Sequence, residues 1–412
     1  MAADSAGVPQ NLATTDTIPL FKRLPTLEKR IPRLPILEQF TPHERLTKLE
    51  QDIASQAGLT ENPFQGRLTI KRDDLSSNQL GGNKARKLEF LIGQAKQNRA
   101  TTLVTSGMWG SNHALATAVA AKQNGLKATM ILGPQPLTEN VRQKLLSMHT
   151  LGANLRFHSH LVGMGFDIAK YYIKAKFSGG NLYYIPSGGS SERGELGYVN
   201  AFLELSQQVG LEQLPERIVV PVGTMGTAAG LLVGSCIAGV FEKVQIVGIG
   251  IAMPLLSNER SARKEAKKLH RFIRNQVEKS DRVTIPDCDY DSEKAFSFVT
   301  QYYSPGYGAA KPVIFETIDR VNRLENIHLD RTYSGKAMQF IIDEFSASYQ
   351  KKLRPPSTLF WLTYNSHDLN DFIDPYPWKN FAEKWRELPS SFWQLFSGEL
   401  PLETNLDPSA SE

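Results

Sequence analysis

The chain has 412 residues, 41% hydrophobic and 22% charged, which is typical of a globular enzyme with two or three domains. The net charge of +5 favours anionic ligands but is too small to indicate binding to nucleic acid. No stretch reaches the roughly 18 consecutive apolar residues of a membrane span, so we expect neither nucleic acid nor a membrane as a partner.

The first 35 residues are rich in proline, threonine and basic side chains and show no helical period. We therefore expect residues 1–35 to form an extended arm on the surface. The same segment lacks a basic region followed by an apolar run, so it does not resemble a secretory signal.

From residue 68 onward, apolar segments bounded by glycine or proline alternate with helical stretches. Short buried strands separated by helices predict an α/β fold with mostly parallel sheets flanked by helices. The clearest predicted strands are 101–107, 127–133, 217–223 and 244–252, and helices are predicted over 111–125 and 228–241.

The stretch GGNKARKLEF (81–90) places Lys84 directly after a Gly-Gly turn, at the start of an amphipathic helix. A lysine there could simply cover a solvated helix face, where most lysines lie. Asp73 and Asp74 precede the turn, and we interpret them as a structural charge network beside it.

Three loops rich in glycine or polar residues follow predicted strands. In SGMWGSNHALA (106–116), Ser111 and Asn112 lie where a helix N-cap would fall, and capping is the plainer role for either residue. The second such loop is IPSGGSSERGELGY (185–198).

The remaining loop, PVGTMGTAAGL (221–231), opens a helix of small residues. Its backbone N–H groups and the helix dipole suit a phosphate group, although a tight turn without a ligand explains the loop equally well. It matches neither the Walker pattern nor the G-x-G-x-x-G spacing of dinucleotide-binding loops.

The two cysteines, Cys236 and Cys288, belong to no cluster with zinc-site spacing. We therefore expect neither a disulfide nor a metal site, and by default a reducing, cytoplasmic location. The basic segment 261–278 carries apolar residues at helical spacing, so we interpret its cations as one exposed face of an amphipathic helix. The C-terminal segment is rich in tryptophan (Trp378, Trp385 and Trp393), which favours a packing appendage or an oligomer contact.

A positioned lysine together with a phosphate cradle is the combination that pyridoxal 5′-phosphate (PLP) requires. Its aldehyde forms a Schiff base with the amine, and its ring withdraws electrons from the substrate Cα. The motifs around Lys84, SNH, IPSGGS, GTMGTAAGL and LDRTYSGKAM occur in this order. They resemble the D-cysteine desulfhydrase and 1-aminocyclopropane-1-carboxylate (ACC) deaminase family of fold type II PLP enzymes, the tryptophan synthase beta-like fold, over about residues 30–365.

The resemblance implies two α/β domains with the cofactor between them. The large domain would hold residues 36–86 and 196–365, and the small domain residues 87–195. The arm 1–35 and the aromatic extension 366–412 would lie outside them. We expect a homodimer that acts on a small amino-acid substrate.

The resemblance also implies catalytic roles for four residues. Lys84 would hold the cofactor and move the Cα proton, and Tyr307 and Tyr333 match the two active-site tyrosines of the family. Ser111 would act beside the substrate carboxylate. Both tyrosines and Ser111 would contact the substrate.

The cofactor contacts implied by the resemblance involve three further loops. Asn112 would donate a hydrogen bond to the 3′ oxygen of the cofactor and would also contact the substrate. His113 would contact the substrate near its carboxylate. Thr363 would face the pyridine nitrogen. The phosphate would be held by Gly223, Thr224, Met225, Gly226 and Thr227.

Three positions depart from the family pattern. Gly110 stands where the family has glutamine, Leu115 where it has arginine, and Tyr364 where it has glycine. Tyr364 puts a bulky side chain where glycine would allow close approach to the ring.

The expected reaction is α,β-elimination on a small D-amino acid, foremost D-cysteine to pyruvate, ammonia and hydrogen sulfide. Ser334 and Thr363 favour it, because the deaminases typically carry glutamate and leucine there. The alternatives are ring-opening deamination of ACC, or a PLP-binding member of the family that has lost catalysis.

Overall fold

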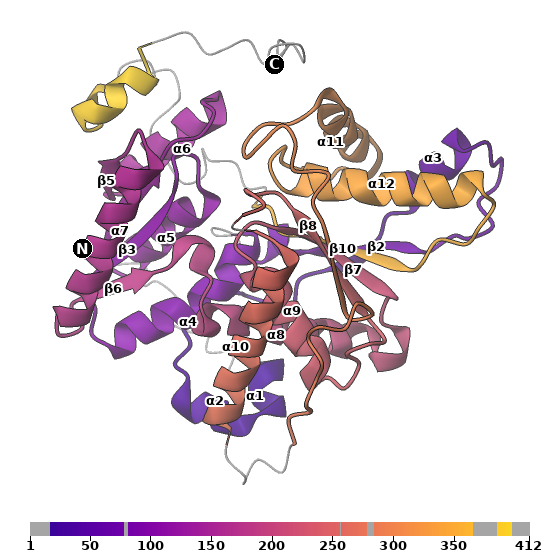
Figure 1. Cartoon of the computed structure of the whole chain (residues 1–412), viewed down its shortest axis with the longest axis horizontal. Coiled ribbons are helices and arrows are strands. Elements are labelled where there is room, and N and C mark those ends of the chain that lie inside the picture. The colour runs from indigo at the N-terminus through magenta and orange to yellow at the C-terminus, as the bar shows by residue number, and fades with distance from the viewer. Residues whose placement is uncertain (1–16, 78–80, 256, 278–283, 366–384, 398–412) are drawn as a thin grey trace, which may run out of the picture.

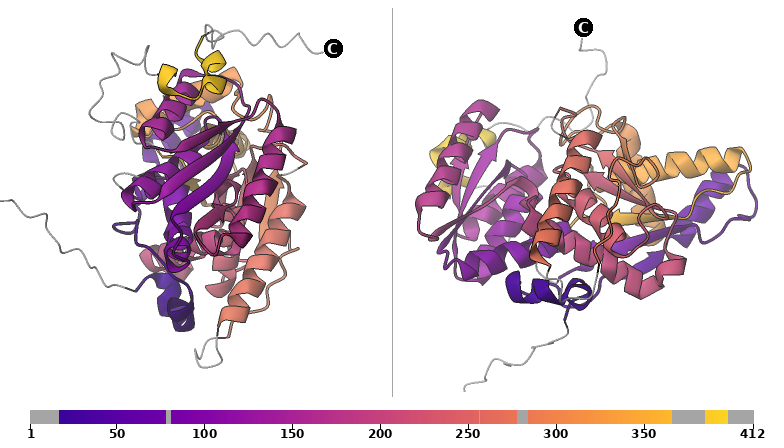
Figure 2. Two further views of the ribbon diagram at one scale, coloured as in Figure 1. Left: turned by 90° about the vertical axis from the view of Figure 1, so that its left-hand side faces the viewer. Right: turned by 60° about the horizontal axis from the view of Figure 1, so that its bottom comes forward.

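The computed structural model describes residues 17–77, 81–255, 257–277, 284–365 and 385–397. Its strands form a six-stranded sheet and a four-stranded sheet that lie side by side (Figure 1). Helices cover both faces of each sheet, as expected for the α/β class. Two further views in Figure 2 show the smaller sheet turned toward the reader and both sheets from below.

The six-stranded sheet has the order β1-β2-β10-β7-β8-β9. Only β1 is antiparallel to its neighbour, and the other pairings are parallel. Strand β10 lies between β2 and β7, so the last strand in chain order pairs with the second one. The strands are β1 (His43–Arg45), β2 (Leu68–Arg72), β7 (Arg217–Val222), β8 (Gln245–Gly250), β9 (Phe296–Val299) and β10 (Thr358–Leu362).

Two helical layers bury the two faces of this sheet. Along β7, Ile218 and Val220 point into one core, and Val219 points into the opposite one, as the two-residue period of a strand requires. The first layer is α8 (Glu192–Val209), α9 (Gly226–Ile237) and α10 (Glu259–Gln276), and the second is α3 (Thr47–Gln56), α11 (Pro312–Glu325) and α12 (Ser334–Gln350). Helix α10 confirms the amphipathic interpretation, since Ala262, Ala266, Leu269 and Ile273 are buried.

The four-stranded sheet is parallel throughout, in the order β5-β4-β3-β6. Its strands are β3 (Thr102–Met108), β4 (Lys127–Gly133), β5 (Asn154–Phe157) and β6 (Leu182–Ile185), all inside the range predicted for the small domain. One face packs on α4 (Asn83–Gln97), α5 (Asn112–Gln123) and α6 (Glu139–Thr150), and the other on α7 (Leu161–Phe177).

The N-terminal segment differs from the extended arm that we predicted. Residues 17–35 contain two short helices, α1 (Pro19–Arg23) and α2 (Pro25–Arg30), each with proline in its first turn. Leu20, Leu24 and Leu27 are completely buried against the α8 side of the large sheet. The prediction of an extended arm was wrong for this part, because helices of five and six residues are too short to show a hydrophobic period. Residues 1–16 lie outside the described residues.

The C-terminal residues 385–397 form two short 3-10 helices, Trp385–Glu387 and Ser390–Leu395. Phe392 and Leu395 are buried in the core of the small sheet, and the Phe392 ring centroid lies 5.0 Å from that of Phe157. This arrangement agrees with a packing appendage. Trp378 lies outside the described residues.

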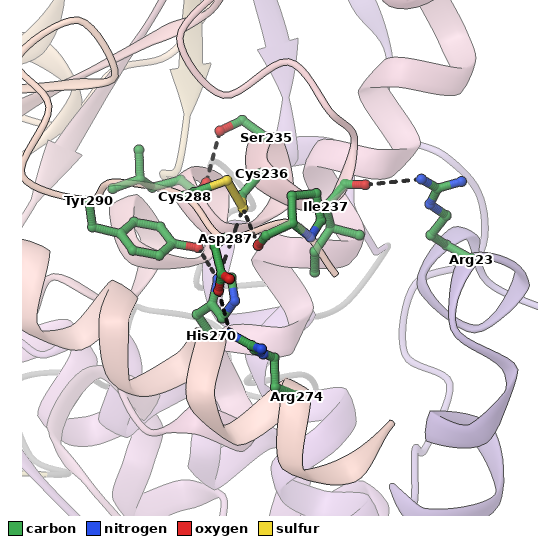
Figure 3. The surroundings of a disulfide bond; sticks show 11 residues. Arg23, Ser235, Cys236, Ile237, His270, Arg274, Asp287, Cys288 and Tyr290 are labelled. Carbon is green, nitrogen blue, oxygen red and sulfur yellow. Dashed lines mark hydrogen bonds and ion pairs between the residues drawn. A yellow bond between two sulfur atoms is a disulfide. The ribbon is translucent and has the colours of Figure 1, made fainter. Parts of the chain in front are cut away.

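A disulfide joins Cys236, near the end of α9, to Cys288 (Figure 3). The prediction of no disulfide was therefore wrong. The two cysteines are 52 residues apart, and only the long-range topology brings them together. The inference of a reducing, cytoplasmic location rested on unpaired cysteines and loses that premise.

Because this disulfide closes a long loop, Cys288→Ser is expected to lower the free energy of unfolding by about 2–4 kcal/mol. Urea denaturation of the oxidised protein and the variant measures the change. Dithiothreitol should lower the wild-type midpoint and leave the variant unaffected. A wild-type midpoint insensitive to dithiothreitol would contradict the expected contribution.

No helix within the described residues is long and apolar enough to cross a membrane. The described part of the chain also holds no group of three or more histidine, cysteine, aspartate or glutamate side chains arranged to bind a metal ion.

Candidate active site

A cavity of about 170 Å³ lies where the carboxyl ends of strands from both sheets face each other. Ligand sites of α/β proteins usually lie at this edge. Nearly every residue predicted for the site lines the cavity: Lys84, Ser111, Asn112, His113, Gly223, Thr224, Met225, Thr227, Tyr307, Tyr333 and Thr363. Gly226 belongs to the same loop but does not line the cavity.

The Gly-Gly turn positions Lys84 against the end of β10. The Gly82 N–H donates to the Asp73 carbonyl at 2.7 Å, and the Asn83 N–H donates to the Thr363 carbonyl at 3.1 Å. Gly82 has a φ of 84°, and a Cβ there would lie 2.9 Å from the Thr363 carbonyl oxygen. Only glycine allows this close packing, which sets Lys84 beside Thr363.

Burial lowers the pKa of Lys84 well below its ordinary value, and the positive charge of Lys87 lowers it further. No carboxylate among the described residues forms an ion pair with Lys84. The lowered pKa favours the neutral amine, which is the form that attacks a carbonyl group.

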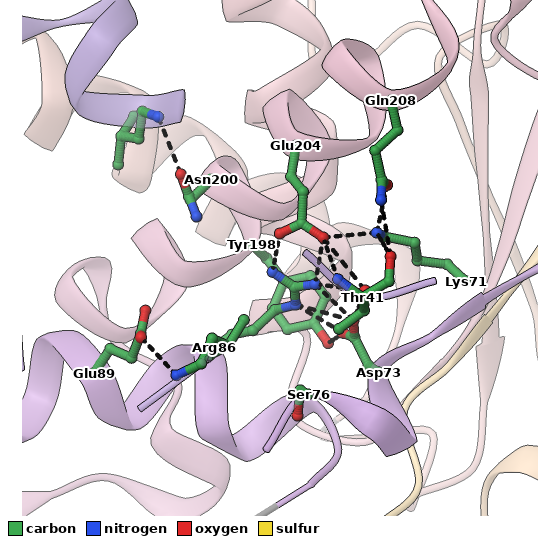
Figure 4. A network of polar contacts seen from close by, with 12 residues as sticks. Thr41, Lys71, Asp73, Ser76, Arg86, Glu89, Tyr198, Asn200, Glu204 and Gln208 are labelled. Carbon is green, nitrogen blue, oxygen red and sulfur yellow. Dashed lines mark hydrogen bonds and ion pairs between the residues drawn. The ribbon is translucent and has the colours of Figure 1, made fainter. Parts of the chain in front are cut away.

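A buried polar network holds the turn and helix α4 in place (Figure 4). The completely buried Asp73 carboxylate accepts hydrogen bonds from Arg86 at 2.8 Å, from the Tyr198 hydroxyl at 2.6 Å and from the Trp361 indole at 2.7 Å. Arg86 also pairs with Glu204 at 2.7 Å. The predicted charge network beside the turn is thus confirmed for Asp73.

The loop from Gly223 to Thr227 leads from β7 into α9. Met225 precedes the helix with a φ of 48°, and the Ala229 N–H makes the first helical bond, to the Met225 carbonyl at 2.9 Å. The N–H groups of Thr227 and Ala228 therefore precede the regular bonding of the helix. With the helix dipole, they are suited to a phosphate group.

The loop 187–190 contacts the loop 223–227, and no site role was predicted for it. The Ser190 hydroxyl donates to Thr224 Oγ1 at 2.8 Å. Lys87 Nζ donates to the Gly188 carbonyl and to Ser190 Oγ, both at 3.2 Å. Lys87 appeared in the sequence as one of several helix cations, and the only signal for the loop was its Gly-Ser turn.

Glu195 is completely buried behind the cradle, and neither carboxylate oxygen has a hydrogen-bond partner among the described residues. Burial raises its pKa to about 8, and the charge of Lys87 opposes this rise. Burial likewise lowers the pKa of Lys87 to about 8, opposed by Glu195. A Cβ on Gly226 would lie 2.6 Å from Ser190 Oγ and 2.9 Å from Glu195 Oε1.

Gly226→Asp is therefore expected to weaken cofactor binding more than the isosteric Gly226→Asn. Both side chains displace Ser190 and Glu195, but only aspartate adds a negative charge to the start of the helix. A repulsion of about 1–2 kcal/mol there corresponds to about a tenfold difference between the two variants. Retention of PLP during dialysis measures it. Equal losses would contradict an anion site.

Helix α5 begins at the second loop. Ser111 is its N-cap and accepts a hydrogen bond from the Ala114 N–H at 3.2 Å, which confirms the capping interpretation. His113 Nε2 donates to Thr105 Oγ1 at 2.9 Å, because the Thr105 hydroxyl itself donates to the Ile185 carbonyl. Burial, together with the charges of Lys84 and Lys87, holds the pKa of His113 well below its ordinary value. The imidazole is therefore neutral.

The two predicted tyrosines form a pair, with 2.7 Å between the Tyr307 and Tyr333 hydroxyl oxygens. Asp330, which was not predicted, lines the cavity and holds the backbone of Tyr333. Its carboxylate accepts hydrogen bonds from the N–H groups of Tyr333 at 3.0 Å and Ser334 at 2.9 Å. Ser334 is completely buried and donates to the Asp330 carboxylate at 2.7 Å, so its hydroxyl supports the turn and does not line the cavity.

The three departures from the family pattern lie in different surroundings. Leu115 is buried in the core of the small sheet. The Gly110 N–H donates to Gln135 Oε1 at 2.9 Å, and a Cβ on Gly110 would lie 2.8 Å from a Val141 methyl carbon. Tyr364 lines the cavity, and burial raises its pKa.

These residues fit a phosphate-bearing aldehyde such as PLP. The nucleophile is a buried lysine with a depressed pKa. The anion site combines unbonded helix N–H groups with the hydroxyls of Thr224 and Thr227. Asn83 joins the two parts, since its amide donates to Thr227 Oγ1 at 3.1 Å.

Comparisons of the sequence with known proteins agree with this fit. A family model described as "Pyridoxal-phosphate dependent enzyme" matches residues 41–363. A Pyrococcus abyssi protein named "Putative 1-aminocyclopropane-1-carboxylate deaminase" is 32% identical over 78% of this chain and 89% of the relative. A Thermotoga maritima protein with the same name is 34% identical over 69% of this chain and 86% of the relative.

Solved structures show the same fold. A crystal structure of an ACC deaminase homologue has a TM-score of 0.63 and 28% identity, covering 84% of this chain and 94% of the other. A PLP-dependent aspartate racemase has a TM-score of 0.51 over 90% of this chain and 100% of the other. With 18% identity, the racemase is similar in fold alone.

Proposed function

The chain belongs to the pyridoxal-phosphate dependent enzymes, as a lyase or deaminase of the ACC deaminase and D-cysteine desulfhydrase type, and from this premise we propose that it catalyses α,β-elimination on a small D-amino acid. The substrate proposed first is D-cysteine, which would yield pyruvate, ammonia and hydrogen sulfide. The observation that carries the proposal is the meeting of Lys84, Thr363 and the Tyr307–Tyr333 pair in one cavity.

In the proposed reaction, bound PLP would supply an aldehyde for the amine and an electron-withdrawing ring. The lowered pKa of Lys84 keeps its amine able to accept the Cα proton of the substrate. The carboxylate of the substrate would lie at the start of α5, where the N–H groups precede the helical bonds and Asn112 lines the cavity.

Tyr307 is the proposed proton donor to the leaving group. Burial raises the pKa of both tyrosines, and the hydrogen bond between them opposes the rise for Tyr307 and adds to it for Tyr333. Either hydroxyl can donate in this bond, and the proposed role requires Tyr333 to donate, so that the Tyr307 proton is free. As the Cβ–S bond breaks, Tyr307 would protonate the thiolate, and hydrolysis of the enamine would give pyruvate and ammonia.

Thr363 supports elimination over ring opening. It presents a neutral hydroxyl to the cavity, and Asp330, the cavity's carboxylate within the described residues, is occupied by N–H groups of its own turn. A carboxylate beside a pyridine nitrogen would favour the protonated ring and strengthen electron withdrawal. Expulsion of a thiolate needs less of this assistance than opening an unactivated cyclopropane ring. Ser334, whose hydroxyl lies outside the cavity, adds no support.

ACC deamination is the second candidate, favoured by the names of the two curated relatives. The test compares two assays on the PLP-loaded protein: sulfide and pyruvate release from D-cysteine, and 2-oxobutyrate release from ACC. We expect D-cysteine to have the higher kcat/KM. Turnover of ACC with inert D-cysteine would reverse the assignment, and inactivity on both would reject both substrates.

A further inference from the structure

A second cavity, of about 280 Å³, adjoins the first between α6 and the turn at residues 330–333. Neither the sequence nor the proposed reaction accounts for it. The two cavities share the wall residues Asn112, Tyr307, Asp330, Tyr333 and Tyr364. The two cavities therefore adjoin at the tyrosine pair, and a substrate side chain that extends past this pair from Lys84 would enter the second cavity.

Lys144, on α6, lines this second cavity with only 7% of its surface exposed. Among the described residues, none forms a hydrogen bond or an ion pair with its amine. Burial lowers the pKa of Lys144 to about 8, while Asp330 raises it and Arg331 lowers it. A buried ammonium group without a partner is costly, so its presence in a cavity indicates an absent anion.

Asp330 does not serve as that partner. Its carboxylate accepts hydrogen bonds from the N–H groups of Thr332 at 3.0 Å and Ser334 at 2.9 Å, and from the Ser334 hydroxyl at 2.7 Å. Arg331 also lines the cavity and lies over the Phe315 ring at 6.0 Å. Lys144 thus faces the cavity without a counter-charge, because Asp330, the carboxylate among the described lining residues, is satisfied by its own turn.

Helix α6 adds to the positive field. It begins after Thr138, whose hydroxyl accepts a hydrogen bond from the Val141 N–H at 3.3 Å, and Thr138 lines the cavity together with Lys144. The positive end of the helix dipole therefore lies at the same cavity as the unpaired ammonium. The Gln135 amide, which lies against Gly110, supplies a neutral donor to the wall.

We propose that this cavity is a subsite for an oxyanion at the end of an amino-acid side chain, so that the protein binds acidic amino acids more tightly than their uncharged amides. The inference rests on the proposed function, because it requires the amino acid to be held at Lys84. A carboxylate is the group we assign to the subsite. A free anion bound there as an effector would have the same chemistry.

The test compares amino acids that differ only in charge. D-glutamate and D-glutamine, and D-aspartate and D-asparagine, are titrated into the PLP-loaded protein, and binding is followed by calorimetry and cofactor absorbance. We expect each acid to bind about tenfold or more tightly than its amide. Lys144→Met should abolish this preference, and Lys144→Arg should retain part of it. The exposed Lys122, changed to methionine, is the matched control.

Equal affinity for acid and amide in the wild type would overturn the proposal, as would an unchanged preference in Lys144→Met. Phosphate that binds through Lys144 without competing with the amino acids would assign the subsite to an effector and overturn the substrate assignment. Failure of the proposed function appears separately, as wild-type inactivity on both D-cysteine and ACC. The binding comparison needs no turnover.

Discussion

Replacing Lys84 with alanine is expected to lower kcat for elimination by about 10³-fold or more, because the covalent link to the cofactor and the proton transfer are lost together. Steady-state release of pyruvate from D-cysteine measures the loss. Lys96→Ala, an exposed position on the same helix, is the control and should keep wild-type activity. Retention of most activity by Lys84→Ala would contradict its assignment.

Borohydride reduction followed by peptide mapping locates the lysine that holds PLP. Two other buried lysines, Lys87 and Lys336, already donate hydrogen bonds to protein groups. Lys87 donates to Gly188 and Ser190, and Lys336 donates to the carbonyl groups of Tyr303 and Gly306 at 3.0 and 3.1 Å. We expect the label on Lys84, and a label on Lys87 or Lys336 would refute the assignment.

The same variant should not lose stability. The pKa of folded Lys84 lies well below 10.5, so from that lowered pKa up to about 10.5 the unfolded chain binds more protons than the folded one. Stability therefore rises with pH across this window, and burying the amine costs free energy below it. Alanine removes the cost. Denaturation of wild type and variant at several pH values should show their difference shrinking as pH rises.

Asp73→Ala is expected to lower the free energy of unfolding by about 3–5 kcal/mol, because it removes one of the two carboxylates that pair with the buried Arg86. Glu204 already pairs with Arg86 at 2.7 Å and with Lys71 at 2.6 Å, and in the variant its single negative charge would face both cations without Asp73. The hydroxyl of Tyr198 and the indole of Trp361 would also lose their acceptor. Urea denaturation provides the measurement.

Asp52→Ala is a suitable comparison, since Asp52 pairs with Arg320 near the surface and such pairs contribute about 0–1 kcal/mol. Asp73→Asn keeps the size of the side chain and removes its charge, so we expect an intermediate loss. A loss below about 1 kcal/mol for Asp73→Ala would mean that the network rearranges around Glu204.

The sequence was informative wherever the signal was local. Each predicted strand has its counterpart in the structure, and the Gly-Gly turn and the three loops all reach one edge of the sheets, because parallel strands place their carboxyl ends together. Lys84 could be singled out because its turn and its neighbours are adjacent in the chain.

Most of the contacts that the sequence missed depend on how distant segments pack together. Lys87 and Glu195 are more than 100 residues apart, and the role of Asp330 depends on where its turn packs. The disulfide of Cys236 depends in the same way on the fold of α9 and α10. Side-chain pairing of this kind follows from the topology, which neither periodicity nor spacing specifies.

The position of β10 determines when the site can form during synthesis. This strand comes from residues 358–362, yet it lies between β2 and β7, and Thr363 directly follows it. Until the ribosome has released this segment, β2 and β7 each present an unpaired edge, which invites association with other chains. A nascent chain that stalls before residue 358 would thus lack the part of the cavity wall formed by Thr363, and the strand that pairs with both β2 and β7. Such a chain would depend on chaperones until synthesis resumes.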